Sequence, residues 1–467
     1  MVVLSELKFP CLKRCIKPIF GSSNRAIADT IATVLVHTID NLPSGLTVLR
    51  IPMPSVKSVT VLSLVNTGSR YEEPKEHGIA HFFEHMVFKG TAKYEDAQAL
   101  SAAVDAVGAD FNAFTSKEYT GYYVKSASKD VELALDVISD MLLTPRLRQD
   151  DIDREKNVII EEMNMYMDSP SRHISDVFDQ MMFEGSGLGH DVIGNKTTVS
   201  ALTASDFTKF LQQWYGLGNT ILVLAGDSSI VDTDSILAKI SDCFSKKTEE
   251  RAGKVKLNNY FTQNPISVFK LKVEHKQTEQ AHFIFGFPGI DRHNSDRYAL
   301  TLLSALLGGN MSSRLFSEIR EKRGLCYYVH SDVDMYHNSG MFGASAGVDP
   351  KRVEEAFKVT IDEFAALVDG RKPVTESEIQ KAKDYVAGKM VLGLEDSESV
   401  AQYFGMKQLL LGEIEPPEVV LAKLRQVTRD EVEAVAKNLI KPSEIRFAVI
   451  GPYKDETPFK KILESYS

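Results

Sequence analysis

The sequence has few cysteines, no long apolar run and no excess of positive charge. Its four cysteines are too few and too scattered for a disulfide framework, which favours a reducing compartment; they are Cys11, Cys15, Cys243 and Cys326. Cys11 and Cys15 have the spacing of half a metal site, but no second pair follows, so we interpret them as two separate thiols. No apolar run reaches the roughly 20 residues of a membrane helix, so no membrane span is predicted. The net charge of -10 argues against general nucleic-acid binding, which usually needs a basic face.

The length of 467 residues predicts more than one domain. Residues 1–38 carry a mild basic bias without a secretory apolar segment. We predict a flexible N-terminal extension there, with an organelle presequence as the alternative. Residues 39–245 and 266–467 are predicted to be two related domains, and the charged stretch 246–265 to be their linker.

The prediction of two related domains depends on a long internal repeat. A strand (58–69), a helix (77–91), paired strands (108–128), a helix (130–145) and a final helix and strand (200–227) are predicted in the first half. The second half repeats this order with a strand (281–289), a helix (297–310), a strand and helix (339–367) and a final helix and strand (424–452). The period is too long for a solenoid, so it indicates a duplicated domain.

The repeat singles out the polar residues of the segment "HGIAHFFEHMVFKGT". When the sequences of the two halves are aligned, His81, Glu84 and His85 correspond to Leu300, Leu303 and Ser304. The second helix is an ordinary core helix. The scaffold therefore does not need the polar residues of the first helix, which favours a functional interpretation over a structural one.

His81 and His85 lie four residues apart, so on a helix both imidazoles point to one side. Zinc favours such nitrogen ligands, and a catalytic zinc site has three protein ligands and an open position. Glu84 lies over the same face and is placed to act as a general base. His-x-x-Glu-His reverses the order of the common His-Glu-x-x-His zinc motif and gives the same spacing of histidines.

A third ligand is expected from the helix predicted at 150–170. Glu161 and Glu162 are both candidates, but neighbouring helix positions point about 100° apart, so only one of them can face the metal. Glu155 lies seven residues before Glu162, on the same face, and is predicted to support a ligand. The alternative without a function is that these glutamates form an ordinary solvent-exposed acidic face of the helix.

With these residues in view, the chain resembles the pitrilysin, insulinase and mitochondrial-processing-peptidase family of zinc metallopeptidases over nearly everything after the N-terminal extension. The family motif is His-x-x-Glu-His, then 76 residues, then Glu, and this count selects Glu162. The resemblance implies an α+β fold of two homologous α/β-roll domains, each an antiparallel sheet covered by helices. It also implies one Zn²⁺ per chain on His81, His85 and Glu162, with Glu84 as the base and Glu155 supporting the site.

The resemblance extends to substrate binding. "GADFNAFTSKEYTGYY" is similar to the family's Asn-Ala-x-Thr edge strand, which implies that Asn112 and Ala113 bind a peptide added as an extra strand. "SSRLFSEIREKRGLCYYV" is similar to the family's Arg and Tyr pair. Arg320 and Tyr327 are therefore expected to hold the substrate carbonyl and to stabilise the oxyanion.

The resemblance also bears on assembly, because short members of the family close a chamber from two subunits, and Arg and Tyr face the zinc of the partner. A homodimer that cleaves short unfolded peptides is therefore expected, with a heterodimer containing an inactive relative as the alternative. Of two acidic positions that bind arginine in the processing peptidase, Asp176 matches and Arg172 does not, so the chain is more similar to bacterial members.

Two other functions compete with peptide cleavage: a structural subunit without activity, and a subunit that presents substrate to another chain. Inactive relatives lose ligands or the base, and this chain retains them all. The expected location is cytoplasmic, with the mitochondrial matrix as the alternative suggested by the basic N-terminus.

Overall fold

The computed structural model describes residues 35–245, 251 and 270–466. The predicted N-terminal extension, with Cys11 and Cys15, therefore lies outside the described residues except for 35–38. The predicted linker lies outside them except for Arg251. Residues from Val36 onward form one compact unit, in which we call the part up to 245 the first half and the part from 270 the second half.

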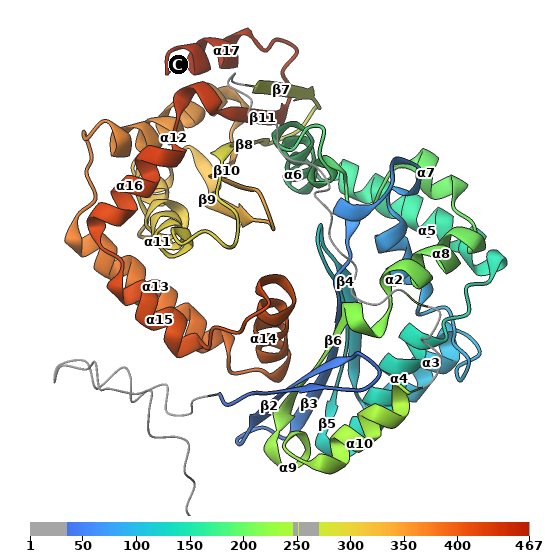
Figure 1. Cartoon of the computed structure of the whole chain (residues 1–467). Coiled ribbons are helices and arrows are strands. Elements are labelled where there is room, and N and C mark those ends of the chain that lie inside the picture. Colours follow the sequence, from blue (N-terminus) through green and yellow to red (C-terminus); the bar gives the residue numbers. More distant parts are fainter. Residues whose placement is uncertain (1–34, 246–250, 252–269, 467) are drawn as a thin grey trace, which may run out of the picture. The chain divides into compact units, whose positions relative to one another are not determined.

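The first half contains a sheet of six strands in the order β1-β2-β6-β3-β5-β4 (Figure 1). The strands are β1 (Thr38–Asn41), β2 (Thr47–Met53), β3 (Ser58–Val65), β4 (Asp110–Thr115), β5 (Thr120–Ala127) and β6 (Thr220–Asp227). Only β2 and β6 run parallel; the other neighbours are antiparallel. Among the described strands, β4 pairs only with β5, so its other edge is open to a further strand.

The second half repeats this sheet with five strands in the order β7-β11-β8-β10-β9. The strands are β7 (Lys270–His275), β8 (Ala281–Pro288), β9 (Cys326–Met335), β10 (Gly340–Val348) and β11 (Arg446–Gly451). Here β7 and β11 are the parallel pair. Both sheets are thus mixed rather than purely antiparallel. The last strand of each half follows a long helical connection and returns parallel to an early strand: β6 lies beside β2, and β11 lies beside β7.

Helices cover both sheets, as the family resemblance implied (Figure 1). The first half contains α2 (Ile79–Met86), α3 (Ala97–Asp105), α4 (Val131–Leu143), α5 (Gln149–Asp168), α6 (Pro170–Met182), α7 (Lys196–Ala201), α8 (Ala204–Trp214), α9 (Ser228–Val231) and α10 (Asp234–Cys243). The second half contains α11 (Arg297–Gly308), α12 (Val353–Val368), α13 (Glu376–Gly393), α14 (Ser397–Leu411), α15 (Pro417–Gln426), α16 (Arg429–Leu439) and α17 (Thr457–Glu464). None of the described helices combines the length and the apolar composition that a membrane crossing requires.

The two halves exchange one helix each, which the sequence did not indicate. Helix α6 of the first half packs on β8 and β11, where Phe178 belongs to a core cluster with Ile284 and Ile450. Helix α14 of the second half packs on β3 and β6. A Cβ atom on Gly405 of α14 would lie 2.7 Å from a Leu64 methyl group, so glycine permits this close approach. The halves are therefore joined by their cores.

Candidate metal centre

Helix α2 presents an apolar face to the core of the first half and a polar face to the opposite side. The buried side chains are spaced three or four residues apart, as on one side of a helix; they are Ile79, Ala80, Phe82, Phe83 and Met86. Phe82 packs edge-on against Phe207, with ring centroids 4.9 Å apart. This spacing leaves His81, Glu84 and His85 on the remaining face.

The helix is shorter than the predicted range 77–91, and its start is fixed by Gly78. Gly78 has a φ of 97°, and a Cβ atom there would lie 2.6 Å from the carbonyl oxygen of Ile193, so glycine is required. Glu72 accepts hydrogen bonds from the backbone N–H groups of Gly78 and Ala80, each over 2.8 Å. These N–H groups have no partner within a helix, so the Glu72 side chain caps α2. Burial raises the pKa of Glu72 to about 8, against the lowering effect of these bonds.

The predicted ligands converge between α2 and α5. One atom from each of His81, His85 and Glu162 lies within 4.8 Å of the other two. His81 Nε2 is 3.8 Å from Glu162 Oε1, and His85 Nε2 is 3.6 Å from Glu162 Oε2. Glu161 is exposed on α5, so the carboxylate that approaches the histidines is that of Glu162. Two imidazole nitrogens and one carboxylate are a donor set that suits zinc and leaves a fourth position for water or substrate.

Glu155 orients His85, and Lys89 in turn pairs with Glu155. Its Nδ1 lies 2.9 Å from Glu155 Oε1, and Lys89 Nζ lies 2.6 Å from Glu155 Oε2. Since Nε2 faces Glu162 and the Glu155 carboxylate can only accept, Nδ1 carries the proton and donates a hydrogen bond to Glu155. Burial acts to raise the pKa of Glu155, but the hydrogen bonds from His85 and Lys89 prevail and hold it below its usual value. The carboxylate therefore stays charged beside the histidine.

Glu84 points toward the same region and is held by Thr115, the last residue of β4. Thr115 Oγ1 donates a hydrogen bond of 2.5 Å to Glu84 Oε2. Burial raises the pKa of Glu84, and Glu162 adds to this, while Thr115 and His85 act in the opposite direction. Burial, with the nearby His85, lowers the pKa of His81 from 6.5 to about 3. His81 is therefore neutral at physiological pH, as a metal ligand must be.

The site opens into a cavity of about 440 Å³ lined by residues from α2, β4, α5 and α6. Tyr166, one turn after Glu162 on α5, donates a hydrogen bond of 2.9 Å to Glu162 Oε1. The Arg172 guanidinium lies 5.7 Å from the centre of the Tyr166 ring. Asp176 also lines the cavity, and burial raises its pKa to about 6. Arg172 thus places a positive charge in the cavity wall, at a position where the processing peptidase is expected to have an acidic residue.

Asn112 and Ala113 lie on β4, the edge strand beside α2. The Ala113 backbone N–H is 2.9 Å from the Asn112 side-chain oxygen, which accepts its hydrogen bond. The side chain of Phe111, next on this strand, packs against Phe88 just after α2, with centroids 5.4 Å apart. β4 is thus fixed to the helix that carries both histidines.

Arg320 and Tyr327 do not line the cavity that contains His81 and Glu162. Arg320 belongs to the π-helical segment η6 (Phe316–Glu321), and it donates a hydrogen bond of 2.7 Å to the carbonyl oxygen of Tyr327. Tyr327 is 71% exposed. The pair is therefore formed and exposed, and it is not part of the cavity at the metal centre of its own chain.

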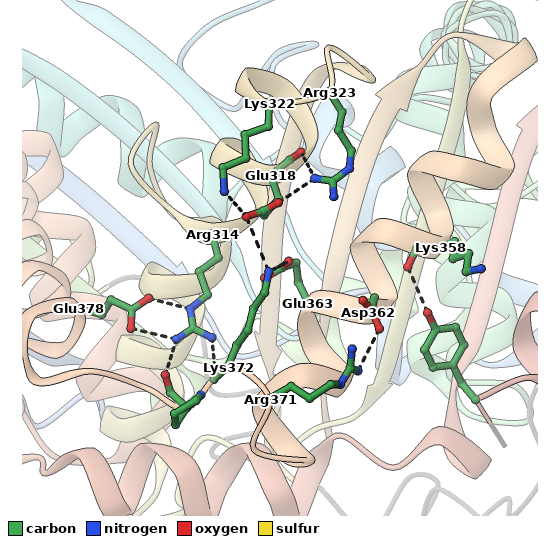
Figure 2. A network of polar contacts seen from close by, with 12 residues as sticks. Arg314, Glu318, Lys322, Arg323, Lys358, Asp362, Glu363, Arg371, Lys372 and Glu378 are labelled. Atoms are coloured by element: carbon green, nitrogen blue, oxygen red, sulfur yellow. Dashed lines mark hydrogen bonds and ion pairs between the residues drawn. The ribbon is translucent and has the colours of Figure 1, made fainter.

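A network of ion pairs surrounds this segment (Figure 2). Glu318 of η6 pairs with Lys322 at 2.5 Å and with Arg323 at 2.7 Å. Just before η6, Arg314 Nε donates a hydrogen bond of 2.7 Å to Glu378 on α13. The Arg314–Glu378 contact attaches the start of this segment to α13, and Arg320 itself is exposed.

Sequence reasoning did not identify Thr115, Tyr166, Lys89 or Glu72. A signal was present for two of them, since Lys89 follows His85 by four residues and Tyr166 follows Glu162 by four, the spacing of one helical face. Thr115 belongs to the Asn-Ala-x-Thr segment, whose pattern does not indicate a contact with Glu84. Glu72 lies outside any periodic element, so only the tertiary structure places it under α2.

The fold and the site are those of a zinc peptidase, and comparisons with known proteins support this class. Residues 47–196 match the model of the insulinase family, peptidase family M16, and residues 201–386 match the model of the M16 peptidase inactive domain. The chain is 37% identical to an uncharacterized zinc protease of Streptomyces coelicolor over 419 residues, which is 89% of each chain. It is 32% identical to an uncharacterized zinc protease of Bacillus subtilis, over 85% of this chain and 94% of that one. The chain therefore belongs to the M16 family of zinc peptidases.

Solved structures show the same fold. A protease from Helicobacter pylori superimposes with a TM-score of 0.81 at 23% identity and covers 90% of this chain and 100% of its own. An M16 peptidase inactive domain from Pseudomonas fluorescens also gives 0.81, at 21% identity, with 90% and 99% covered. The predicted α+β fold of two related domains is thus confirmed.

Proposed function

We propose that this chain is a zinc endopeptidase in which His81, His85 and Glu162 hold the metal and Glu84 is the general base. The observation that carries the proposal is the convergence of two Nε2 atoms and one carboxylate beside a second, hydrogen-bonded carboxylate. When bound, zinc supplies the Lewis acidity that makes water a nucleophile near neutral pH. Glu84 takes the proton from the attacking water and later gives it to the leaving amine.

The substrate is an extended peptide that adds to β4 as an edge strand. The Ala113 N–H, which now bonds the Asn112 side chain, is a donor that a peptide carbonyl would take over. Main-chain pairing of this kind demands an unfolded substrate and little sequence specificity. Thr115 at the end of the same strand keeps Glu84 next to the scissile bond.

Glu84→Gln tests the catalytic proposal. Zinc per chain and hydrolysis of a quenched, unstructured peptide are measured for both forms, and we expect equal zinc and a loss of at least about 10³-fold in kcat for the variant. A wild type without zinc, or a variant that cleaves equally well, would refute the peptidase assignment and favour a structural or substrate-presenting subunit.

We further propose a homodimer in which Arg320 and Tyr327 complete the site of the partner subunit. Their exposure, and their place outside the cavity of their own metal centre, support this arrangement. Two inactive variants, Glu84→Gln and Arg320→Ala, should complement each other when mixed and reassociated. After random reassociation, half of the dimers would contain one subunit of each variant. One of the two sites in each mixed dimer would have both an intact Glu84 and an intact Arg320, so about one quarter of the wild-type activity should return. No recovery, with mixed dimers present, would contradict shared sites.

A further inference from the structure

Glu118 lies in the turn between β4 and β5, and its carboxylate is buried with 2% exposed. Two guanidinium groups pair with it: Arg70 Nη1 with Oε1, and Arg292 Nη2 with Oε2. His337 also donates its backbone N–H to Oε1 over 3.1 Å. Arg70 belongs to the first half, and Arg292 and His337 belong to the second. Glu118 therefore ties the hairpin turn beside the metal centre to the other half of the chain.

This contact is built from equivalent parts of the two halves. Each hairpin has a turn (116–119 and 336–339) closed by a backbone hydrogen bond of 2.8 Å from its first to its fourth residue. In each half, an arginine shortly after the preceding strand donates its backbone N–H to a carbonyl of that turn, over 2.8 Å for Arg70 and 3.0 Å for Arg292. The two turns and the two arginines thus meet at one place.

The charges at this place are unequal. The third residue of one turn is Glu118, but the third residue of the other is the neutral Asn338, whose side-chain oxygen accepts a hydrogen bond from Arg70 Nη2. Burial lowers the pKa of both arginines, to about 10 for Arg292. Arg292 Nε has no hydrogen-bond partner among the described residues. One carboxylate therefore neutralises two buried cations, and its loss leaves both uncompensated.

The turn is directly connected to the catalytic face. Thr115, which donates to Glu84, immediately precedes turn 116–119. The turn has no room to shift toward the first half, since a Cβ atom on Gly68 would lie 2.3 Å from the carbonyl oxygen of Ser116. Release of Glu118 would remove the contacts of the turn with Arg292 and His337 of the second half, whereas the hydrogen bond from the Arg70 N–H would still hold the turn from the side of the first half. Thr115 would then be positioned from one side.

We propose that Glu118 is a positioning residue: its ion pairs across the two halves hold β4 and Thr115 where Glu84 needs them for peptide hydrolysis. The inference deepens the proposed function and rests on it for its kinetic part. Its structural part, that the second half orders the β4–β5 hairpin through Glu118, is independent of activity.

Glu118→Gln in the full-length zinc-loaded protein tests both parts. We expect faster amide hydrogen exchange in residues 110–127, and a kcat about 10-fold lower with KM changed less than about threefold, since β4 stays paired with β5. Adding Asn338→Asp places a carboxylate against Arg70 again and should restore slow exchange and most of the activity. Glu415→Gln is the matched control, because Glu415 is also buried and pairs with two cations of the second half, Arg297 and Lys423. It should leave exchange of the hairpin and kcat unchanged.

A double-mutant cycle with Thr115→Val separates positioning from a general loss of folded protein. If Glu118 acts through Thr115, Glu118→Gln should cost less than about threefold in kcat once Thr115 is changed, whereas loss of folded enzyme would multiply both effects. Unchanged exchange in 110–127, or fully additive losses, overturns the proposal. A wild type that holds zinc and cleaves no peptide refutes the proposed function instead, and the exchange data then decide the structural part alone.

Discussion

Removal of Glu155 should weaken zinc binding without disturbing the fold. Its carboxylate accepts the hydrogen bond of 2.9 Å from His85 Nδ1, and it has only 7% of its side chain exposed. Loss of such a partner costs about 10- to 100-fold in metal affinity, which is about 1.4–2.7 kcal/mol. Glu155→Gln keeps an acceptor oxygen but no charge, so we expect the smaller loss of zinc affinity, about 10-fold. Glu155→Ala removes the acceptor, so we expect the larger loss, about 100-fold.

The position of Lys89 adds to this effect. In the wild type its ammonium group lies 2.6 Å from Glu155 and is compensated by it. In Glu155→Ala the cation stays near His85 and disfavours a second cation at the metal site, although the 29% exposure of Lys89 lets water screen it. Lys89→Met in the Glu155→Ala background should therefore recover part of the lost affinity, by about threefold.

Competition with a chelator measures these affinities, and kcat is compared at saturating zinc, where the variants should approach the wild type. Glu161→Gln is the matched control, because it changes an exposed carboxylate of the same helix that is not among the groups that converge at the metal centre. If Glu155→Ala binds zinc within twofold of the wild type, Glu155 does not orient His85 as we infer.

Three further predictions address the helix start, the histidine charge and the cavity wall. Gly78→Ala forces a side chain into φ 97° and against Ile193, so it should cost about 1–3 kcal/mol and lower the melting temperature of the chain together with its zinc content. In zinc-free protein, folding lowers the pKa of His81 from 6.5 to about 3, so the unfolded chain binds a proton that the folded chain does not. The free energy of unfolding therefore has its full value above pH 6.5 and falls as the pH decreases toward 3. Thermal melts between pH 4 and 7 should therefore vary less for His81→Gln than for the wild type, and equal slopes would exclude this linkage. Arg172→Glu should raise kcat/KM for peptides with basic residues near the cleavage site by about 10-fold relative to acidic ones, and an unchanged ratio would show that Arg172 does not face substrate.

Local patterns were sufficient to predict most elements. The apolar spacing predicted a helix within 77–91, and the apolar run ending in turn residues predicted a strand within 58–69; both form, as α2 and β3. The boundaries of α2 were less predictable. Its start depends on a close approach between Gly78 and Ile193, which are far apart in sequence.

The parallel pairs and the exchanged helices were also beyond sequence reasoning. A strand pattern shows which face is buried but not which neighbour the strand takes, so the pairing of β2 with β6 was not visible. The residues of α6 are those of an ordinary amphipathic helix, and nothing local says that its apolar face, with Phe178, packs on the sheet of the other half.

The sequence alone determined which side chains of α2 share the polar face at the candidate metal centre. Two histidines four residues apart must share a helix face, and Glu84 must lie beside them, whatever the rest of the chain does. Tertiary structure decided which distant groups complete that face, because hydrogen bonds from Thr115 to Glu84 and from His85 to Glu155 join residues 31 and 70 positions apart. It also decided that Glu118 receives two arginines from different halves, since a buried charge is stabilised by whichever opposite charges the fold brings to it.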